Sequence, residues 1–233
     1  MVLILGAIYK EIAYMVDSLE DSSIVKFGMR TYHIGKLAGH DVAIGNTGVG
    51  KVQSSIVSQM AISYFKPDYY IFIGTAGALN PDLKIGDFVV CDECVQYDMD
   101  CSDLGLPAGR TPYCPENMQI LHSDPVLLEC ALDFVPPDGS RSIRGRVLTG
   151  DSVVGNIGGK EKLVAAFSGD VVEMEGYAAS FCAAMNKIPF LLIRVVSDQA
   201  DGNVKIDYVK FLDCASEKLD SIVVHILNNN PVF

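Results

Sequence analysis

The mostly apolar run Ile188–Val196 stops abruptly at Ser197 and Asp198. Its composition and length predict a buried strand. In α/β proteins the reactive groups lie where strands end, because the loops there place side chains on a ligand while the sheet holds them rigid. An acidic cluster, Glu173–Met174–Glu175, and a helix-like run precede the strand. The stretch Val171–Asp201 is therefore predicted to form one side of an active site.

Further strands and helices alternate along the chain. The predicted strands are Val2–Ala7, Tyr69–Ile73, Asp87–Cys91 and Ser142–Thr149, and the predicted helices are Ile8–Leu19, Lys51–Phe65, Asp124–Phe134, Lys160–Phe167 and Tyr208–Leu227. The segment Phe27–Asn46 alternates in short pieces broken by turns, which predicts an antiparallel meander. Proline and glycine in Tyr97–Asn117 predict a long loop. This order predicts an α/β protein with one domain, residues 1–233, folded as a three-layer α/β/α sandwich around a central mixed β-sheet.

The charge balance and the cysteines restrict partners and location. The chain has 18 Lys and Arg against 29 Asp and Glu, a net charge of −11 at pH 7, whereas a phosphate backbone requires a basic surface. No nucleic-acid partner is therefore predicted. Seven cysteines without metal-type or disulfide-type spacing indicate reduced thiols and a cytoplasmic protein. The N-terminus, MVLILGAIYKEI, resembles neither a signal peptide nor a membrane span.

Two glycine turns, Gly48–Gly50 and Gly74–Gly77, each follow a predicted strand. They indicate a small ligand that contacts the backbone at both places, although a glycine turn can also merely connect two elements. Neither turn is a P-loop, and neither matches the full three-glycine dinucleotide pattern. The four histidines are isolated from one another and from cysteine pairs. No metal site and no cofactor are therefore predicted.

Three carboxylates, Glu11, Glu175 and Asp198, lie at or just after strand ends. Cleavage of a glycosidic bond uses one carboxylate to orient or deprotonate water and one carboxylic acid to protonate the leaving group. An acidic residue is more often a solvated surface group, and Asp198 could instead cap the following helix. A charge at the edge of an apolar core is costly unless it is paired or used, which favours a function. Arg194 shares a strand face with Asp198 if the strand is regular, so a structural Arg–Asp or Arg–Glu pair is the alternative there.

Six motifs match a known family in order and spacing: GAIYKEI, TGVGKV, IGTAGAL, VLTGDS, VVEMEGYA and RVVSDQAD. They resemble the motifs of the 5′-methylthioadenosine/S-adenosylhomocysteine nucleosidases, over nearly the whole chain. VEMEG and SD together are specific to the nucleoside phosphorylase/nucleosidase superfamily. The resemblance implies a nucleoside phosphorylase-like fold and a homodimer in which a loop of the neighbour closes the pocket. We expect the dimer interface on the Lys51–Phe65 helix and the Cys101–Asn117 loop.

The resemblance also implies roles for single residues. Glu11 is expected to activate water, and Asp198, oriented by Ser197, is expected to protonate the imidazole-ring nitrogen of adenine. Arg194 and Thr75 are expected near the water. The expected substrate-binding residues are Glu175 at the ribose hydroxyls, Met174 against the sugar, Val153 and Val154 at the adenine edge, and Glu173, Thr75, Ala76, Gly77 and Val49. The implied reaction is hydrolysis of the N-glycosidic bond of 5′-methylthioadenosine and S-adenosylhomocysteine, which releases adenine and the 5-thioribose product.

Water is favoured over phosphate as the nucleophile. The bacterial phosphorylases that the chain resembles carry arginines in the first glycine turn and two residues before the second. This chain has Ile8, Tyr9 and Lys10 in the first place and Phe72 in the second, so no guanidinium is present to bind phosphate there. Lys10 is the residue in the first glycine turn whose positive charge could bind phosphate, which is the argument against this interpretation.

Other substrates and functions stay open. Val153 stands where the family often has an aromatic residue on the base, and Thr75 and Ala78 depart from the usual GSAGG motif. Aminodeoxyfutalosine and 5′-deoxyadenosine are therefore alternative substrates. A phosphate-dependent purine or uridine phosphorylase and a nucleoside-binding sensor are the remaining alternatives. The sequence does not choose between methionine salvage, quorum-signal precursor formation and menaquinone synthesis.

Overall fold

The structure is a computed structural model that describes residues 1–200 and 204–231, so Asp201 of the predicted site stretch lies outside the described residues. The strands are β1 (Val2–Gly6), β2 (Glu20–Phe27), β3 (Arg30–Leu37), β4 (His40–Asn46), β5 (Tyr69–Ala78), β6 (Phe88–Gln96), β7 (Leu121–His122), β8 (Ser142–Thr149), β9 (Val171–Glu173) and β10 (Phe190–Asp198). The helices are α1 (Tyr9–Asp17), α2 (Lys51–Phe65), α3 (Pro125–Leu132), α4 (Ile157–Phe167), α5 (Gly176–Met185) and α6 (Val204–Asn229).

The ten strands in the described part of the chain belong to one mixed sheet. Its order is β10-β6-β8-β9-β5-β1-β4-β3-β2, with β7 on β6, and β5 also pairs with β10. The five strands β5, β10, β6, β8 and β9 therefore close into a ring. Strands β4, β1, β5 and β10 are mutually parallel, so their carboxyl ends meet at the same edge of the sheet. This edge carries the functional groups described below.

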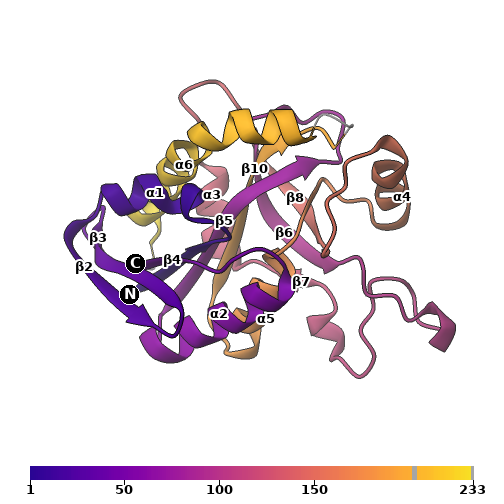
Figure 1. The fold of residues 1–233 in the computed structure, drawn as a ribbon, viewed down its shortest axis with the longest axis horizontal. Coiled ribbons are helices and arrows are strands. Elements are labelled where there is room, and N and C mark those ends of the chain that lie inside the picture. Colours follow the sequence, from indigo (N-terminus) through magenta and orange to yellow (C-terminus); the bar gives the residue numbers. More distant parts are fainter. Residues whose placement is uncertain (201–203, 232–233) are drawn as a thin grey trace.

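Helices cover both faces of the sheet (Figure 1). Helices α1, α3 and α6 pack on one face around a core that contains Ile12, Leu127 and Leu219. Helices α2 and α5 pack on the other face around Val57 and Ala179. The three-layer α/β/α sandwich with a mixed sheet is thus confirmed. Among the described helices, none is long and apolar enough to cross a membrane.

Most predicted elements are confirmed, and β8 has the predicted bounds. The sequence pattern does not predict β2, because its residues are mostly exposed and lack apolar alternation; it forms by antiparallel pairing with β3. Strand β9 is only three residues long, too short to be recognised from a pattern. The predictions for β5 and β6 end too early. Strand β5 continues through Gly77 because it pairs with β10 and β9, and β6 continues past an irregularity between Cys91 and Glu93.

Candidate active site

A cavity of about 270 Å³ lies at the edge where β5, β9 and β10 end. Its size suits a small molecule rather than a polymer. Twelve of the thirteen predicted site residues line it: Glu11, Val49, Thr75, Ala76, Gly77, Val153, Val154, Glu173, Met174, Glu175, Ser197 and Asp198. Arg194 does not line the cavity and lies fully buried beside it.

Glu11 is buried in the first turn of α1 and is fixed by four hydrogen bonds. One carboxylate oxygen accepts from the backbone N–H groups of Ala7 (2.8 Å) and Ile8 (3.1 Å). The other accepts from the backbone N–H (3.0 Å) and the hydroxyl (3.1 Å) of Thr75 at the end of β5. The carboxylate is therefore held rigidly in one orientation at the cavity wall, as a positioned base requires.

Asp198 is the last residue of β10 and is buried, like Ser197 before it. The Ser197 hydroxyl donates to Asp198 Oδ2 (2.9 Å), and the backbone N–H of Ala200 donates to Oδ1 (3.0 Å). The register of β10 shifts between Val196 and Asp198, so the simple alternation that would put Asp198 on the same face as Arg194 does not hold. The shift coincides with the placement of the carboxyl group in the cavity wall.

Glu175 lines the same cavity and is buried. Its Oε1 accepts a hydrogen bond from the backbone N–H of Gly50 (2.7 Å), which joins the site to the first glycine turn. Burial first, and then the nearby carboxylate of Glu173, raise the pKa of Glu175 to about 8, against the lowering effects of the Gly50 hydrogen bond and of Arg194. The Glu175 side chain is therefore largely a neutral acid at pH 7.

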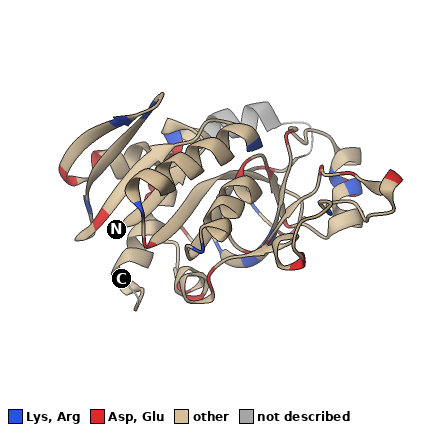
Figure 2. Cartoon of the chain, turned by 90° about the horizontal axis from the view of Figure 1, so that it is seen from below, with Lys and Arg blue, Asp and Glu red and all other residues tan. Residues whose placement is uncertain are grey.

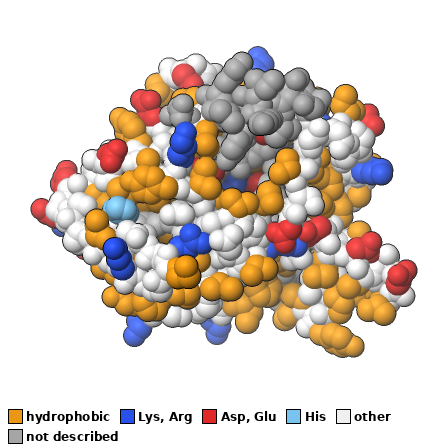
Figure 3. Space-filling model, in the orientation of Figure 1, with side chains coloured by type: hydrophobic (Ala, Val, Ile, Leu, Met, Phe, Trp, Pro, Cys, Tyr) orange, Lys and Arg blue, Asp and Glu red, His pale blue; other side chains and the backbone are white. Residues whose placement is uncertain are grey.

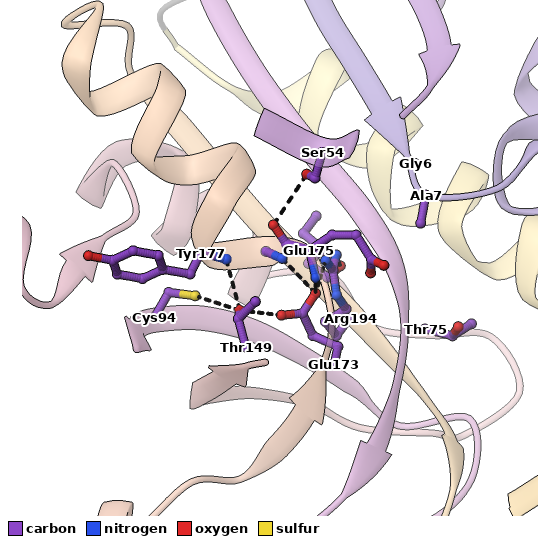
Figure 4. A network of polar contacts seen from close by, with 12 residues as sticks. Gly6, Ala7, Ser54, Thr75, Cys94, Thr149, Glu173, Glu175, Tyr177 and Arg194 are labelled. Atoms are coloured by element: carbon purple, nitrogen blue, oxygen red, sulfur yellow. Dashed lines mark hydrogen bonds and ion pairs between the residues drawn. The ribbon is translucent and has the colours of Figure 1, made fainter. Parts of the chain in front are cut away.

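Glu173 and Arg194 form a buried ion pair behind the cavity (Figure 4). Arg194 Nη2 donates to Glu173 Oε2 (2.6 Å), which also accepts from the backbone N–H groups of Glu175 (2.9 Å) and Gly176 (2.7 Å). Of the pairings that the sequence left open for Arg194, the structure contains the Arg–Glu pair. The guanidinium also lies over the Phe72 ring, 4.9 Å from its centroid. Phe72 therefore stabilises Arg194 through a cation–π interaction.

The loop that carries Val153 and Val154 is tied to the start of α2. The Lys51 ammonium contacts Asp98 (2.5 Å) and Asp151 (3.7 Å), and the Lys51 backbone N–H donates to Asp151 Oδ1 (2.8 Å). The Asp151 backbone N–H in turn donates to Asp98 Oδ2 (2.9 Å). These contacts fix the first residues of the loop, which places the two valines over the cavity.

The sequence reasoning missed four residues that line the cavity: Ala7, Ile8, Ser152 and Val172. All four lie within or next to motifs already recognised, so motif membership could have identified them. They escaped because none carries a charged or unusual group. The cavity lining contains no Lys or Arg among the described residues, and Lys10 lies exposed outside it. Figure 2 shows the basic residues distributed over separate elements.

Comparison with known proteins agrees with this geometry. Residues 2–228 match the family model described as the phosphorylase superfamily. The chain belongs to the phosphorylase superfamily. A curated member of similar sequence is the aminodeoxyfutalosine nucleosidase of Campylobacter jejuni, 30% identical over 209 residues, which are 90% of each chain.

Several solved structures that are similar to this phosphorylase-superfamily chain are nucleosidases. A 5′-methylthioadenosine/S-adenosylhomocysteine nucleosidase from Colwellia psychrerythraea, in complex with adenine, has a TM-score of 0.93 at 28% identity, over 98% of this chain and 95% of that one. The corresponding enzyme from Neisseria meningitidis, in complex with methylthio-immucillin-A, has a TM-score of 0.89 at 30% identity, over 97% of each chain. The resemblance seen in the motifs is thus confirmed.

Proposed function

We propose that the chain hydrolyses the N-glycosidic bond of 5′-methylthioadenosine and S-adenosylhomocysteine, releasing adenine and the 5-thioribose product. The observation that carries this proposal is the presence of Glu11 and Asp198 in the wall of one cavity, on different elements and each fixed by hydrogen bonds. This arrangement supplies the base and the acid that glycosidic cleavage uses. The nucleosidases with similar structures support the choice of substrate.

Asp198 is the proposed general acid. In its protonated form it donates to the imidazole-ring nitrogen of adenine, and the bond between the base and C1′ breaks as the purine takes up the electron pair. Ser197 holds one carboxyl oxygen at 2.9 Å, and Ala200 holds the other. These contacts keep the acid in the direction that proton transfer requires, because proton transfer depends on geometry first.

Glu11 is the proposed general base. Water attacks C1′ of the oxocarbenium-like sugar, and its proton passes to Glu11. Thr75 orients the carboxylate through two hydrogen bonds. Arg194 lies next to Glu11 across Gly74: a Cβ atom added there would lie 3.1 Å from Glu11 Oε1 and 3.3 Å from Arg194 Nη1. We propose that the guanidinium helps to place the water.

The remaining residues are proposed to hold the nucleoside. Glu175, as a neutral acid with a pKa of about 8, can both donate to and accept from ribose hydroxyls. Met174 packs on the sugar, and the backbone of Val153 and Val154 contacts the adenine edge. Glu173 already receives hydrogen bonds from protein groups on both oxygens, so its proposed contribution to binding is to hold Glu175. Val49, Ala76 and Gly77 complete the wall.

Hydrolysis is proposed over phosphorolysis on electrostatic grounds. A phosphate dianion requires cationic partners, and the described lining of the cavity provides none. Phe72, at one of the positions where the phosphorylases have arginine, is buried under Arg194. Lys10 is exposed and does not belong to the cavity lining. Water therefore meets a lower electrostatic barrier than phosphate as the nucleophile.

Aminodeoxyfutalosine is a second candidate substrate, because a relative at 30% identity is a nucleosidase for it. Purified protein in phosphate-free buffer should release adenine from 5′-methylthioadenosine and S-adenosylhomocysteine, with inosine as the negative control. The ratio of kcat/KM for 5′-methylthioadenosine to that for aminodeoxyfutalosine decides between the two. A ratio far below one would identify aminodeoxyfutalosine as the preferred substrate instead of 5′-methylthioadenosine. Release of no adenine from either substrate would contradict the proposal.

We also propose a cytoplasmic homodimer. The cysteines are all free thiols, which fits a reducing compartment. Exposed apolar side chains cover one face of α2 and the Cys101–Asn117 loop, namely Val52, Ile56, Tyr64, Leu104 and Tyr113. Figure 3 shows hydrophobic side chains along the lower edge of the molecule, where Figure 1 places α2. Apolar surface of this kind is typical of a protein interface.

A further inference from the structure

Thr149, the last residue of β8, is fully buried behind the cavity and does not line it. Strands β8 and β9 are parallel, and their register puts Thr149 opposite Glu173. The two side chains therefore meet at the end of their strands (Figure 4). The Thr149 hydroxyl does not line the cavity, but it is bonded to Glu173, which does.

The hydrogen bonds of Thr149 have a fixed direction. The backbone N–H of Tyr177 can only donate, and it donates to Thr149 Oγ1 (2.8 Å). The single proton of the hydroxyl is then free to point to Glu173 Oε1, with which Thr149 is hydrogen-bonded. The sulfur of Cys94 lies 3.6 Å from the same hydroxyl. Thr149 therefore donates to one oxygen of Glu173 and leaves the other oxygen to Arg194.

Glu173 links Thr149 to the reacting groups. With Oε1 held by Thr149, Oε2 faces Arg194 Nη2 and two backbone N–H groups. The second terminal nitrogen of Arg194, Nη1, donates to the carbonyl of Ile193 (2.9 Å) and lies next to Glu11 across Gly74. Rotation of the Glu173 carboxylate would move the guanidinium relative to Glu11.

We propose that Thr149 is a positioning residue for the hydrolytic step: its hydroxyl fixes the Glu173 carboxylate, which places the Arg194 guanidinium beside Glu11. This inference rests on the proposed function, since Glu11 and Arg194 act there on the attacking water. Thr149 contacts neither the sugar nor the base. Its loss should therefore lower kcat by a larger factor than it raises KM for the nucleoside.

The first test compares Thr149→Val, which keeps the shape and removes the hydroxyl, with Thr149→Ser, which keeps the hydroxyl. We expect Thr149→Val to lower kcat for adenine release by about tenfold to a hundredfold, and Thr149→Ser to restore most of it. Ser58→Ala is the control, because it also removes a buried hydroxyl, one that bonds to Tyr70. The control should lower Tm without lowering kcat. Unchanged kcat in Thr149→Val would overturn the inference.

A second test asks whether Thr149 acts through Arg194. Thr149→Val is combined with Arg194→Met, and adenine binding verifies that each variant is folded. The Thr149 effect on kcat should shrink to less than about twofold in the Arg194→Met background, because coupled residues are not additive. An equal loss in both backgrounds would show a merely structural role. If Arg194→Met does not fold, the first test still decides whether Thr149 is a positioning residue, through the kcat loss in Thr149→Val and its rescue by Thr149→Ser.

The wild-type protein in the same assay separates this inference from the proposed function. A wild type that releases no adenine contradicts the proposed function and the inference with it. An active wild type together with an unaffected Thr149→Val contradicts the inference alone.

Discussion

Glu173 and Glu175 lie two residues apart, yet their surroundings are opposite. Glu173 receives hydrogen bonds from Thr149, from Arg194 and from two backbone N–H groups. Glu175 receives one, from Gly50, and burial raises its pKa to about 8. In the same stretch of chain, Glu173 is therefore bound to protein groups, including Arg194, whereas Glu175 is a neutral acid that can contact a ligand.

The raised pKa of Glu175 makes a prediction about stability. Folding disfavours the ionised form, so the stability that the neutral acid provides is present below the unfolded pKa of about 4.5 and is lost as the pH rises through about 8. Glu175→Gln stays neutral at every pH. We expect its Tm to match that of the wild type near pH 5 and to exceed it increasingly up to about pH 9. Parallel Tm curves across this range would contradict the raised pKa.

Asp198→Asn should fold normally and lose at least about 10²-fold in kcat, the usual contribution of a general acid. The amide preserves the size of the side chain and can still accept from Ser197 or Ala200, so Tm and adenine binding serve as controls. Steady-state adenine release gives the kcat. Near-normal turnover would show that the purine leaves without a proton from this residue.

At the scale of single elements, β5 has little room for a side chain at Gly74. A Cβ at Gly74 would lie 3.1 Å from Glu11 Oε1 and 3.3 Å from Arg194 Nη1, which is closer than side-chain contacts normally allow. The bare backbone of β5 therefore lets the base and the guanidinium approach each other. This close approach explains why a strand in the middle of the sheet contains a glycine despite its cost to strand stability.

Gly74→Ala should push Glu11 and Arg194 apart by a few tenths of an ångström and lower kcat by about tenfold or more. Gly158→Ala in α4 is the matched control, because the added Cβ would meet its nearest atom at 3.6 Å and alanine favours a helix. The control should retain full turnover. Equal kcat values for both variants would contradict the close packing of the two groups.

The elements differ in how far the sequence predicts them. Mostly apolar runs such as β10 and β1 are recognised because both of their faces are buried, and the glycine turns are recognised by composition. Strand β2 is not, because its stability comes from pairing with β3 rather than from its own pattern. The partner of Arg194 could not be chosen either. It depends on the register of β8, β9 and β10 and on the irregularity before Asp198, which are tertiary properties.

At the scale of the whole molecule, one sheet connects β2 to β10, and we propose on this ground that residues 1–233 form a single domain. The apolar face of α2 is the feature that the monomer leaves unexplained. Its side chains Val52 and Ile56 are 69% and 56% exposed, although most residues of a solvated helix face are polar. A second copy of the chain would cover them.

Ile56→Glu should therefore convert a dimer into a monomer at micromolar concentration, because a charge in an apolar interface must be desolvated. Ile24→Glu is the matched control, since Ile24 is similarly exposed but belongs to β2 rather than to α2. Light scattering gives the mass of each variant. A wild type that is already monomeric with full activity would contradict the proposed homodimer.

The central claim is that water, placed by Glu11 and Arg194, is the nucleophile. The most direct test is the mass of the sugar product formed from 5′-methylthioadenosine in buffer that contains inorganic phosphate. We predict free 5-methylthioribose, at a rate that does not depend on the phosphate concentration. Formation of 5-methylthioribose 1-phosphate would contradict the account, because it would require a cationic phosphate site that the described lining of the cavity does not provide.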